Sequence, residues 1–217
     1  MKESRRFEVV GFDIDETFTP SISWQMMTKG MGASVDELIR LYEALKQGKM
    51  SLTAAQDALI RVWQASGNAR KSFLTKLFMR HQIYPDSLPT VQYLQKKGYR
   101  VVIISGGVDL YVKTIARRLG VADSFPNTKL LWEGDNLIGM EYELDQAGKK
   151  LRQFKAYLKR VGGSRDKSVF VGDSSNDRAV MEYTGHGVLV KTPAYEAEME
   201  KVAWKVVDRV GELRKIL

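Results

Sequence analysis

Cysteine is absent from this chain of 217 residues, and histidine occurs only twice. Without thiols, the protein can form neither a disulfide nor a thiolate-bound metal site. No apolar run reaches the length that a bilayer-spanning helix needs. The charged N-terminal residues lead into a short strand-like run, whereas a secretory signal would continue as an apolar helix. The sequence therefore predicts a cytoplasmic protein that has no membrane partner.

Acidic residues are fewer than basic ones: 26 Asp and Glu stand against 34 Lys and Arg, which gives a formal net charge of +8. Such a surplus could attract a phosphate ester, a nucleic acid or a membrane surface. The basic residues are scattered over predicted helix faces, however, without a long block and without interleaved aromatic residues. We interpret them as a solvated surface and expect no nucleic-acid partner, although a basic nucleic-acid-binding protein is the alternative that the charge suggests.

Three short apolar runs, at 7–12, 101–104 and 169–171, are typical of strands buried on both faces of a parallel sheet. Amphipathic helical stripes separate these runs, and several of the stripes end at glycine. The alternation predicts an α/β fold, a Rossmann-like, doubly wound parallel sheet. The segment 136–142 is interpreted as a short hairpin arm.

The region between the first two predicted strands has a different sequence pattern, in which no segment is typical of a strand. Residues 34–37 resemble a capping box that opens a helix, and 51–66 and 69–82 are typical of further helices. We therefore expect a small helical domain at 21–82. It interrupts an α/β core domain that is formed by 1–20 and 83–217.

Residues that carry chemistry follow each of the three predicted strands. They are Asp13 and Asp15 after the first strand, Ser105, Gly106 and Gly107 after the second, and Asp173, Asn176 and Asp177 after the third. Ligands gather at the carboxyl ends of parallel strands, so these side chains are expected to converge. Carboxylates that converge repel each other unless a cation lies between them, and Mg²⁺ is a hard cation that commonly bridges carboxylates to a substrate phosphate.

The first two aspartates are expected to have different roles. Asp13 can attack phosphorus in line and form an aspartyl-phosphate, while Asp15 can protonate the departing oxygen and later deprotonate the attacking water. Ser105, the amides of the Gly-Gly turn and a lysine are suitable donors to a phosphoryl group. Lys149 and Lys150 both lie at a predicted helix start; spacing does not separate them, and we prefer Lys149.

Four motifs occur in a defined order: Asp-x-Asp-x-Thr at 13–17, Ser-Gly-Gly at 105–107, a lysine at 149 or 150, and Gly-Asp-x-x-x-Asp at 172–177. In this order they resemble the haloacid dehalogenase superfamily, specifically its phosphoserine-phosphatase-like branch, over nearly the whole chain. The resemblance implies that the helical insertion is a cap domain. It also implies a phosphatase that acts on a small phosphorylated metabolite, with a phosphotransferase or mutase as the alternative.

The resemblance implies roles for the motif residues. Asp13 is the expected nucleophile and Asp15 the expected general acid and base, with its backbone carbonyl on the metal. The remaining expectations are a phosphate-binding set and a metal-binding set, the latter with Asp177 as an outer support and Thr17 in a supporting position. The phosphate-binding set is Ser105, Gly106, Gly107, Lys149, Lys150 and Asn176, and the Mg²⁺ set is Asp13, Asp15, Asp173 and Asp177.

The expected cap departs from the pattern of phosphoserine phosphatases, which carry a Glu shortly after the first motif and an Arg on a cap helix. Here 18–27 holds no Asp or Glu, Leu59 stands at the Arg position with Arg61 nearby, and Glu16 replaces the usual Gly or Ser. A missing polar reader removes selectivity by orders of magnitude, which argues against phosphoserine as the substrate.

A set of aromatic and methionine side chains in the helical segment has two interpretations. The set could line an apolar pocket, or it could form ordinary core between the helices, which is the more frequent use of such stripes. The residues concerned are Trp24, Met26, Met27 and Trp63.

Overall fold

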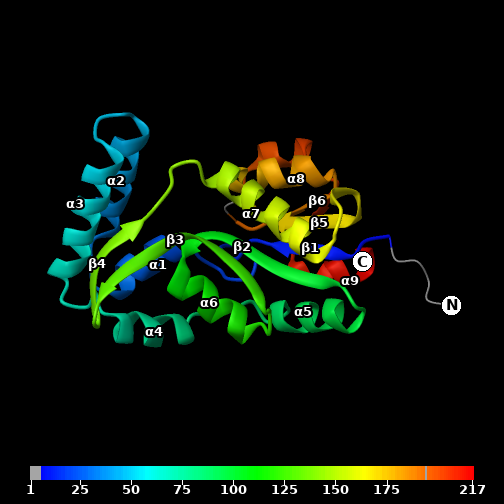
Figure 1. Ribbon diagram of the computed structural model, residues 1–217, viewed down its shortest axis with the longest axis horizontal. Helices are drawn as coiled ribbons and strands as arrows, with labels where there is room; N and C mark the ends of the chain where they lie inside the picture. The colour runs from blue at the N-terminus through cyan, green and yellow to red at the C-terminus, as the bar shows by residue number, and fades with distance from the viewer. Residues whose placement is uncertain (1–5, 194) are drawn as a thin grey trace.

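The computed structural model describes residues 6–193 and 195–217 (Figure 1). The strands are β1 (Val9–Phe12), β2 (Arg100–Val108), β3 (Asp123–Glu133), β4 (Asn136–Glu141), β5 (Ser168–Gly172), β6 (Gly187–Val190) and β7 (Lys205–Val207). The α-helices are α1 (Ser23–Gly30), α2 (Val35–Lys46), α3 (Leu52–Ala65), α4 (Lys71–Met79), α5 (Ser87–Lys96), α6 (Asp109–Arg118), α7 (Gln146–Val161), α8 (Arg178–Thr184) and α9 (Leu213–Ile216). Short 3₁₀ helices are η1 (Arg165–Lys167), η2 (Ser175–Asp177), η3 (Ala197–Lys201) and η4 (Val210–Glu212).

The strands form one sheet in the order β4-β3-β2-β1-β5-β6-β7. All neighbouring pairs are parallel except β3 and β4, which form an antiparallel hairpin at one edge. The predicted α/β fold with a doubly wound parallel sheet is therefore confirmed, and the predicted hairpin arm is the second strand of this pair.

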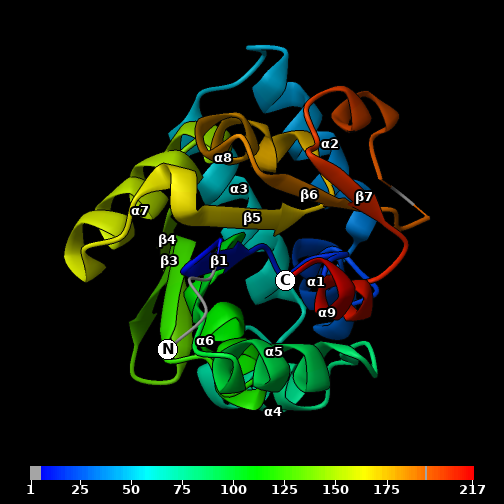
Figure 2. The ribbon, with the colours of Figure 1, turned by 90° about the vertical axis from the view of Figure 1, so that its right-hand side faces the viewer.

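Helices cover both faces of the sheet, as the continuous apolar strands require. Figure 1 shows α7 and α8 on one face and α5 and α6 on the other, and Figure 2 shows β5, β6 and β7 edge-on between α8 and α9. Along β1, Val10 and Phe12 are buried in the core with α5 and α6, while Val9 is buried in the second core with α7 and α8. Successive side chains of a strand alternate between faces, so one short strand supplies both cores.

Close packing at the middle of the sheet explains a glycine in β1. A Cβ atom at Gly11 would lie 2.7 Å from a ring carbon of Phe170 and 2.8 Å from a ring carbon of Phe154. Only glycine lets the α7 side of the sheet approach β1 this closely. The close contact fixes α7, which carries a lysine of the site described below, directly over the central strand.

The segment between β1 and α5 is helical, as predicted, and its helices begin at recognisable caps. Ser34 caps α2 by accepting a hydrogen bond from the Glu37 amide at 3.2 Å, and Ser51 caps α3 in the same way through the Ala54 amide. Both are typical N-cap contacts. Helix α1 was not predicted individually, because the Ile22 that precedes it offers no side-chain cap.

The β3–β4 hairpin extends away from the sheet and lies along α3 (Figure 1). Gln64 of α3 donates to the Leu137 carbonyl at 2.8 Å, and the Ser72 hydroxyl donates to Asp135 at the hairpin turn at 2.7 Å. The hairpin therefore joins the sheet to the helical segment. The division of the chain into a helical domain at 21–82 and a core domain at 1–20 and 83–217 stays a prediction. Residues 1–5 of the core domain lie outside the described residues.

Within residues 6–193 and 195–217, no helix combines the length and the apolar character that crossing a membrane requires.

Candidate active site

Asp13 is the first residue after β1, the strand that lies between β2 and β5 in the middle of the sheet. Its amide donates to the Val171 carbonyl of β5 at 2.9 Å, so the backbone hydrogen bonds of the sheet continue to Asp13. The side chain is 5% exposed. Among the described residues, its Oδ1 atom has no hydrogen-bond partner although it is buried. A buried acceptor without a partner is costly unless a ligand satisfies it, which marks this oxygen as a point of ligand contact.

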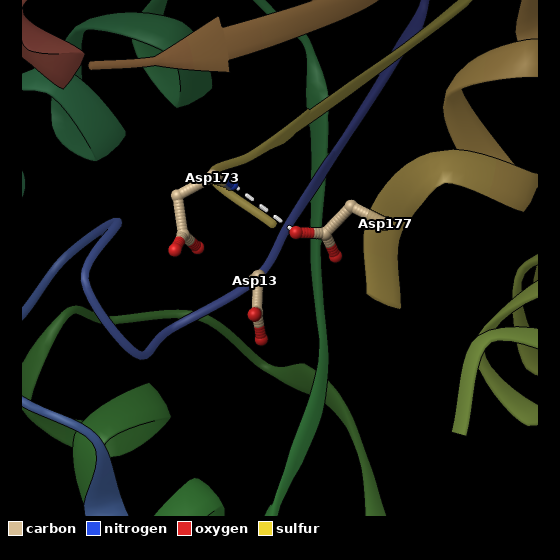
Figure 3. Close-up of side chains that lie close together, drawn as sticks. All are labelled: Asp13, Asp173 and Asp177. Atoms are coloured by element: carbon tan, nitrogen blue, oxygen red, sulfur yellow. Dashed lines mark hydrogen bonds between the residues drawn. The ribbon is translucent and has the colours of Figure 1, made fainter. Parts of the chain in front are cut away.

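Asp173 and Asp177 come from the turn after β5 and lie beside Asp13 (Figure 3). One carboxylate oxygen from each of the three residues lies within 4.8 Å of the others. The Asp173 amide donates to Asp177 Oδ2 at 3.2 Å, and Thr17 donates to Asp173 at 3.3 Å. A Cβ atom at Gly172 would lie 2.2 Å from Asp177 Oδ2, so glycine is required for this turn.

Lys150 provides the positive charge in this cluster. Its Nζ atom lies 2.8 Å from Asp13 Oδ2 and 2.7 Å from Asp177 Oδ1, and the side chain is 1% exposed. Burial alone would lower the pKa of this amine, but the carboxylates of Asp13 and Asp177 raise it above its ordinary value. Lys150 is therefore charged throughout the physiological range, and the buried cation offsets part of the repulsion between the aspartates.

The structure places Lys150, and not the preferred Lys149, in the aspartate cluster. The Lys149 Nζ atom donates to the Asn127 carbonyl at 2.7 Å and lies 3.8 Å from Glu143, outside the aspartate cluster. Successive residues of a helix point about 100° apart, so only one of two neighbouring lysines can face the cluster. Lys150 lies four and seven residues before the buried Phe154 and Tyr157 of α7, and this spacing is the sequence signal that could have identified it.

Asp15 has a different environment from Asp13. Its Oδ2 atom accepts hydrogen bonds from the Ser23 amide at 2.8 Å and from the Ser23 hydroxyl at 2.6 Å. Burial and the nearby Asp13 raise the pKa of Asp15 to about 7, although the Ser23 hydrogen bonds act in the opposite direction. A carboxyl group that titrates near neutrality can both donate and accept a proton. Sequence reasoning missed Ser23, whose type and position carry no signal without the fold.

The Asp15 side chain does not belong to the aspartate cluster that could hold a metal. Its carboxylate is oriented by Ser23, and its backbone carbonyl accepts a hydrogen bond from the Thr17 amide at 2.7 Å. The structure therefore does not support a metal contact by the Asp15 side chain, because its carboxylate accepts hydrogen bonds from Ser23 at the start of α1. The expected carbonyl contact of Asp15 stays a prediction.

The remaining predicted residues lie around the same strand ends. Ser105 is buried, and its Oγ atom accepts a hydrogen bond from the Gly107 amide at 3.2 Å. Gly106 and Asn176 line the cavity that contains Asp13, Asp15, Lys150 and Asp173. A Cβ atom at Gly107 would lie 3.2 Å from the Ser23 hydroxyl, so a glycine here leaves room for the donor to Asp15.

The donor set fits a hard divalent cation. Burial is the main cause that raises the pKa values of Asp173 and Asp177, and repulsion between the aspartates raises them further. A divalent ion held by Asp13 and Asp173 would offset this repulsion. Both oxygens of Asp177 are already engaged by Lys150 and by the turn amides. Its role as an outer support stays a prediction.

A cavity of about 420 Å³ extends from the aspartates to the helical segment. Its far wall is formed by α2 and α3 and includes Leu59, while the exposed Arg61 is not among its lining residues. Trp24 lines the cavity, as expected if these aromatic and methionine side chains form an apolar pocket. Met27 and Trp63 are buried core, and Met26 packs against that core, as the other interpretation expected.

Glu16 also borders the cavity, and its backbone has a φ of +54°. The left-handed region is sterically costly for residues with a Cβ atom, so the sharp turn after Asp15 holds Glu16 under local strain. Burial raises the pKa of the Glu16 carboxyl. Glu16 therefore lies in the lining of the same cavity as Asp173.

Curated relatives match parts of this chain. It is 25% identical over 186 residues to a phosphoserine phosphatase of Archaeoglobus fulgidus, which covers 85% of this chain and 53% of that protein. It is 28% identical over 142 residues to a glyceraldehyde 3-phosphate phosphatase of Methanothermobacter thermautotrophicus, which covers 62% of this chain and 58% of that protein. The chain thus spans about half the length of the curated relatives it matches.

Solved structures share the fold. A substrate-bound phosphoserine phosphatase superposes with a TM-score of 0.75 at 19% identity, covering 98% of both chains. A phospho-aspartyl intermediate analogue of phosphoserine phosphatase superposes with a TM-score of 0.74 at 20% identity, covering 98% of this chain and 100% of that chain. The family model described as haloacid dehalogenase-like hydrolase matches residues 10–182. The chain therefore belongs to the haloacid dehalogenase-like hydrolase family.

Proposed function

We propose that this protein is a magnesium-dependent phosphatase, which hydrolyses a small phosphomonoester through an aspartyl-phosphate formed on Asp13. The observation that carries the proposal is the buried, unpartnered Oδ1 atom of Asp13, which lies beside Lys150 in a cavity that also reaches Asp15 and Asp173. Curated relatives named as phosphatases of two different phosphate esters support the reaction class.

In the first step, Asp13 attacks phosphorus and the bond between phosphorus and the ester oxygen breaks. The departing oxygen takes a proton from Asp15, so an alcohol leaves and phosphate stays on Asp13. The raised pKa of Asp15 keeps a substantial protonated fraction at neutral pH. Ser23 holds the Asp15 carboxyl in one orientation through its two hydrogen bonds.

In the second step, water attacks the same phosphorus and the bond to Asp13 breaks. Asp15, now ionised, accepts a proton from this water, so inorganic phosphate leaves and both aspartates regain their starting states. One carboxyl group thus serves as acid and then as base. Its pKa of about 7 suits both duties near neutral pH.

Negative charge on the transferring phosphoryl group needs compensation throughout. Lys150 supplies one fixed positive charge at 2.8 Å from Asp13. When bound by Asp13 and Asp173, magnesium supplies further positive charge to the phosphoryl oxygens. The Ser105 hydroxyl and the backbone at Gly106, near the end of β2, are the proposed donors at the same edge, and prearranged donors of this kind account for much of phosphoryl-transfer catalysis.

The division into two domains is part of the proposal. Residues 1–20 and 83–217 carry the aspartates and the lysine, and 21–82 form a helical cap over the cavity. The cap supplies most of the far cavity wall. Selection among phosphate esters therefore rests with the cap, and the reaction itself with the core.

The proposal is tested by phosphate release from p-nitrophenyl phosphate with and without magnesium. Asp13→Asn should abolish turnover, and Asp166→Asn, an exposed matched control, should leave it unchanged. Turnover by Asp13→Asn at the wild-type rate would refute the role of Asp13. Release of free phosphate without an added acceptor separates hydrolysis from transfer to a second alcohol.

A further inference from the structure

The cavity that begins at the aspartates ends on an apolar wall. Leu38, Leu41 and Leu45 line it from α2, and Leu52 and Leu59 line it from α3. With Ala55 of α3 included, these positions repeat every three to four residues, so each helix turns an apolar face toward the cavity. The wall and the reactive aspartates therefore belong to one space of about 420 Å³.

Among the described residues, those that α1, α2 and α3 contribute to the wall are all uncharged. The polar ones are Gln25, Tyr42 and Gln56. The charged groups of the cavity all come from outside α1, α2 and α3. Lys150 is the single cation among the lining residues that the structure describes, and it is committed to Asp13 and Asp177. A carboxylate on the substrate would therefore lose its hydration without gaining a cationic partner.

Besides Ile22, which is 39% exposed, two side chains of α2 that line the cavity remain exposed. Ile39 is 40% exposed, and Tyr42, which adds an apolar ring to its polar hydroxyl, is 47% exposed. Apolar side chains scattered singly on a surface need no explanation, but a contiguous apolar lining marks a binding site. These two residues continue the leucine wall outward, which extends the apolar surface available to a ligand.

Trp24 links the apolar wall to the phosphate end of the cavity. Its indole nitrogen donates to the Gly106 carbonyl at 3.2 Å, and its ring packs edge-on against Tyr142 with centroids 5.7 Å apart. The indole is thus fixed between the glycine turn and the hairpin. A phosphoryl group placed at Asp13 would direct its alcohol portion past this ring onto the leucine wall.

From these contacts we infer that the substrate is the phosphate monoester of an uncharged, apolar alcohol, whose hydrocarbon portion packs against α2 and α3. The inference rests on the proposed function, because it assigns the cavity to the leaving alcohol. A hydrocarbon buried here gains about fourfold in affinity for each methylene removed from water. Phosphoserine is excluded by the same wall, since its carboxylate finds no cation there.

The test measures binding and turnover separately with the full chain and magnesium. Calorimetric titration with n-alkylphosphonates, which cannot be hydrolysed, should show Kd falling about 200-fold from ethyl- to hexylphosphonate. The phosphonate analogue of phosphoserine should bind more weakly than butylphosphonate. Phosphate release from the matching alkyl phosphates should show the same rise in kcat/KM with chain length.

A variant pair ties the effect to the wall. The double variant Ile39→Ser with Tyr42→Ser should weaken hexylphosphonate binding by about tenfold and flatten the chain-length dependence. Ile138→Ser is the control, because Ile138 is 51% exposed on β4 and does not line the cavity. Circular dichroism and thermal melting verify that both variants are folded.

The outcomes separate the inference from the proposed function. A flat phosphonate series, or tighter binding of the phosphoserine analogue, overturns the apolar substrate, and the phosphatase proposal survives if phosphate is still released through Asp13. Graded phosphonate binding without release of phosphate from any alkyl ester supports the apolar pocket and overturns the phosphatase. Graded binding together with graded turnover supports both.

Discussion

Replacement of Lys150 by methionine is the substitution with the largest predicted consequence. Methionine keeps most of the volume and removes the charge. In the folded protein Lys150 lies 2.8 Å from Asp13 and 2.7 Å from Asp177, and all three side chains are at least 90% buried. Lys150→Met therefore leaves two buried carboxylates facing each other without their cation.

The magnitude follows from the burial of the cluster. Breaking a buried ion pair by removing one partner costs about 3–5 kcal/mol. For a chain of this size, 1 kcal/mol corresponds to about 2–4 °C in Tm, so the expected loss in metal-free protein is about 6–20 °C. The loss should shrink as pH falls from 8 to 5, because burial raises the pKa of Asp177 to about 6 and protonation of this carboxyl removes uncompensated charge.

Lys149→Met is the matched control, because it changes the neighbouring residue of the same helix. Lys149 is 27% exposed, and its contacts are a carbonyl and a partly exposed glutamate. Contacts of this kind contribute about 1–2 kcal/mol together. The assay is urea or thermal unfolding with EDTA present, accompanied by p-nitrophenyl phosphate turnover with magnesium.

Activity should discriminate between the two lysines more sharply than stability does. Loss of a prearranged charge at the phosphoryl group lowers kcat by about 10²–10³-fold, which is the expectation for Lys150→Met only. Equal losses of stability and activity in the two variants would refute the assignment of Lys150, and with it the view that a buried cation organises the site.

Three further results are expected. Burial raises the pKa values of Asp15 and Asp173 above their values in the unfolded chain. The free energy of unfolding of the metal-free protein should therefore fall as pH rises from about 4 to 7, and magnesium should raise Tm most at the upper end of this range. Calorimetry that shows the opposite slope would contradict this expectation. Ser23→Ala removes a hydrogen bond that lowers the pKa of Asp15, so the pH–rate profile of kcat/KM should move upward, and an unmoved profile would dismiss the role of Ser23. Glu16→Gly relieves a φ of +54° and should stabilise the protein by about 0.5–1 kcal/mol in urea unfolding, whereas an ordinary substitution by glycine destabilises.

Much of the fold could be predicted because local patterns agree with the global structure. The strands β1, β2 and β5 are continuous apolar runs, and α2 and α3 begin at serine caps. Each of these signals lies within a few neighbouring residues. Helix α1 has neither a capping side chain nor an acidic first turn, so it could not be identified individually, although it delivers Ser23 to Asp15.

The convergence of Asp13, Asp173 and Asp177 could be predicted because parallel strands end at one edge. The choice between Lys149 and Lys150 depends on the rotation of α7 about its axis. That rotation is fixed by Phe154 and Tyr157 in the core, and the position of a lysine at the start of the helix does not reveal it. The cavity wall depends on packing between the helices and the hairpin, contacts that are distant in sequence and carry no local pattern.

The central claim is that Asp13 becomes covalently phosphorylated. Rapid quenching during turnover, reduction of the acyl phosphate with borohydride and peptide mapping by mass spectrometry would test it most directly. We expect Asp13 to be converted to homoserine only when substrate and magnesium are present. Phosphate release without modification of Asp13, or with the modification at another residue, would contradict it.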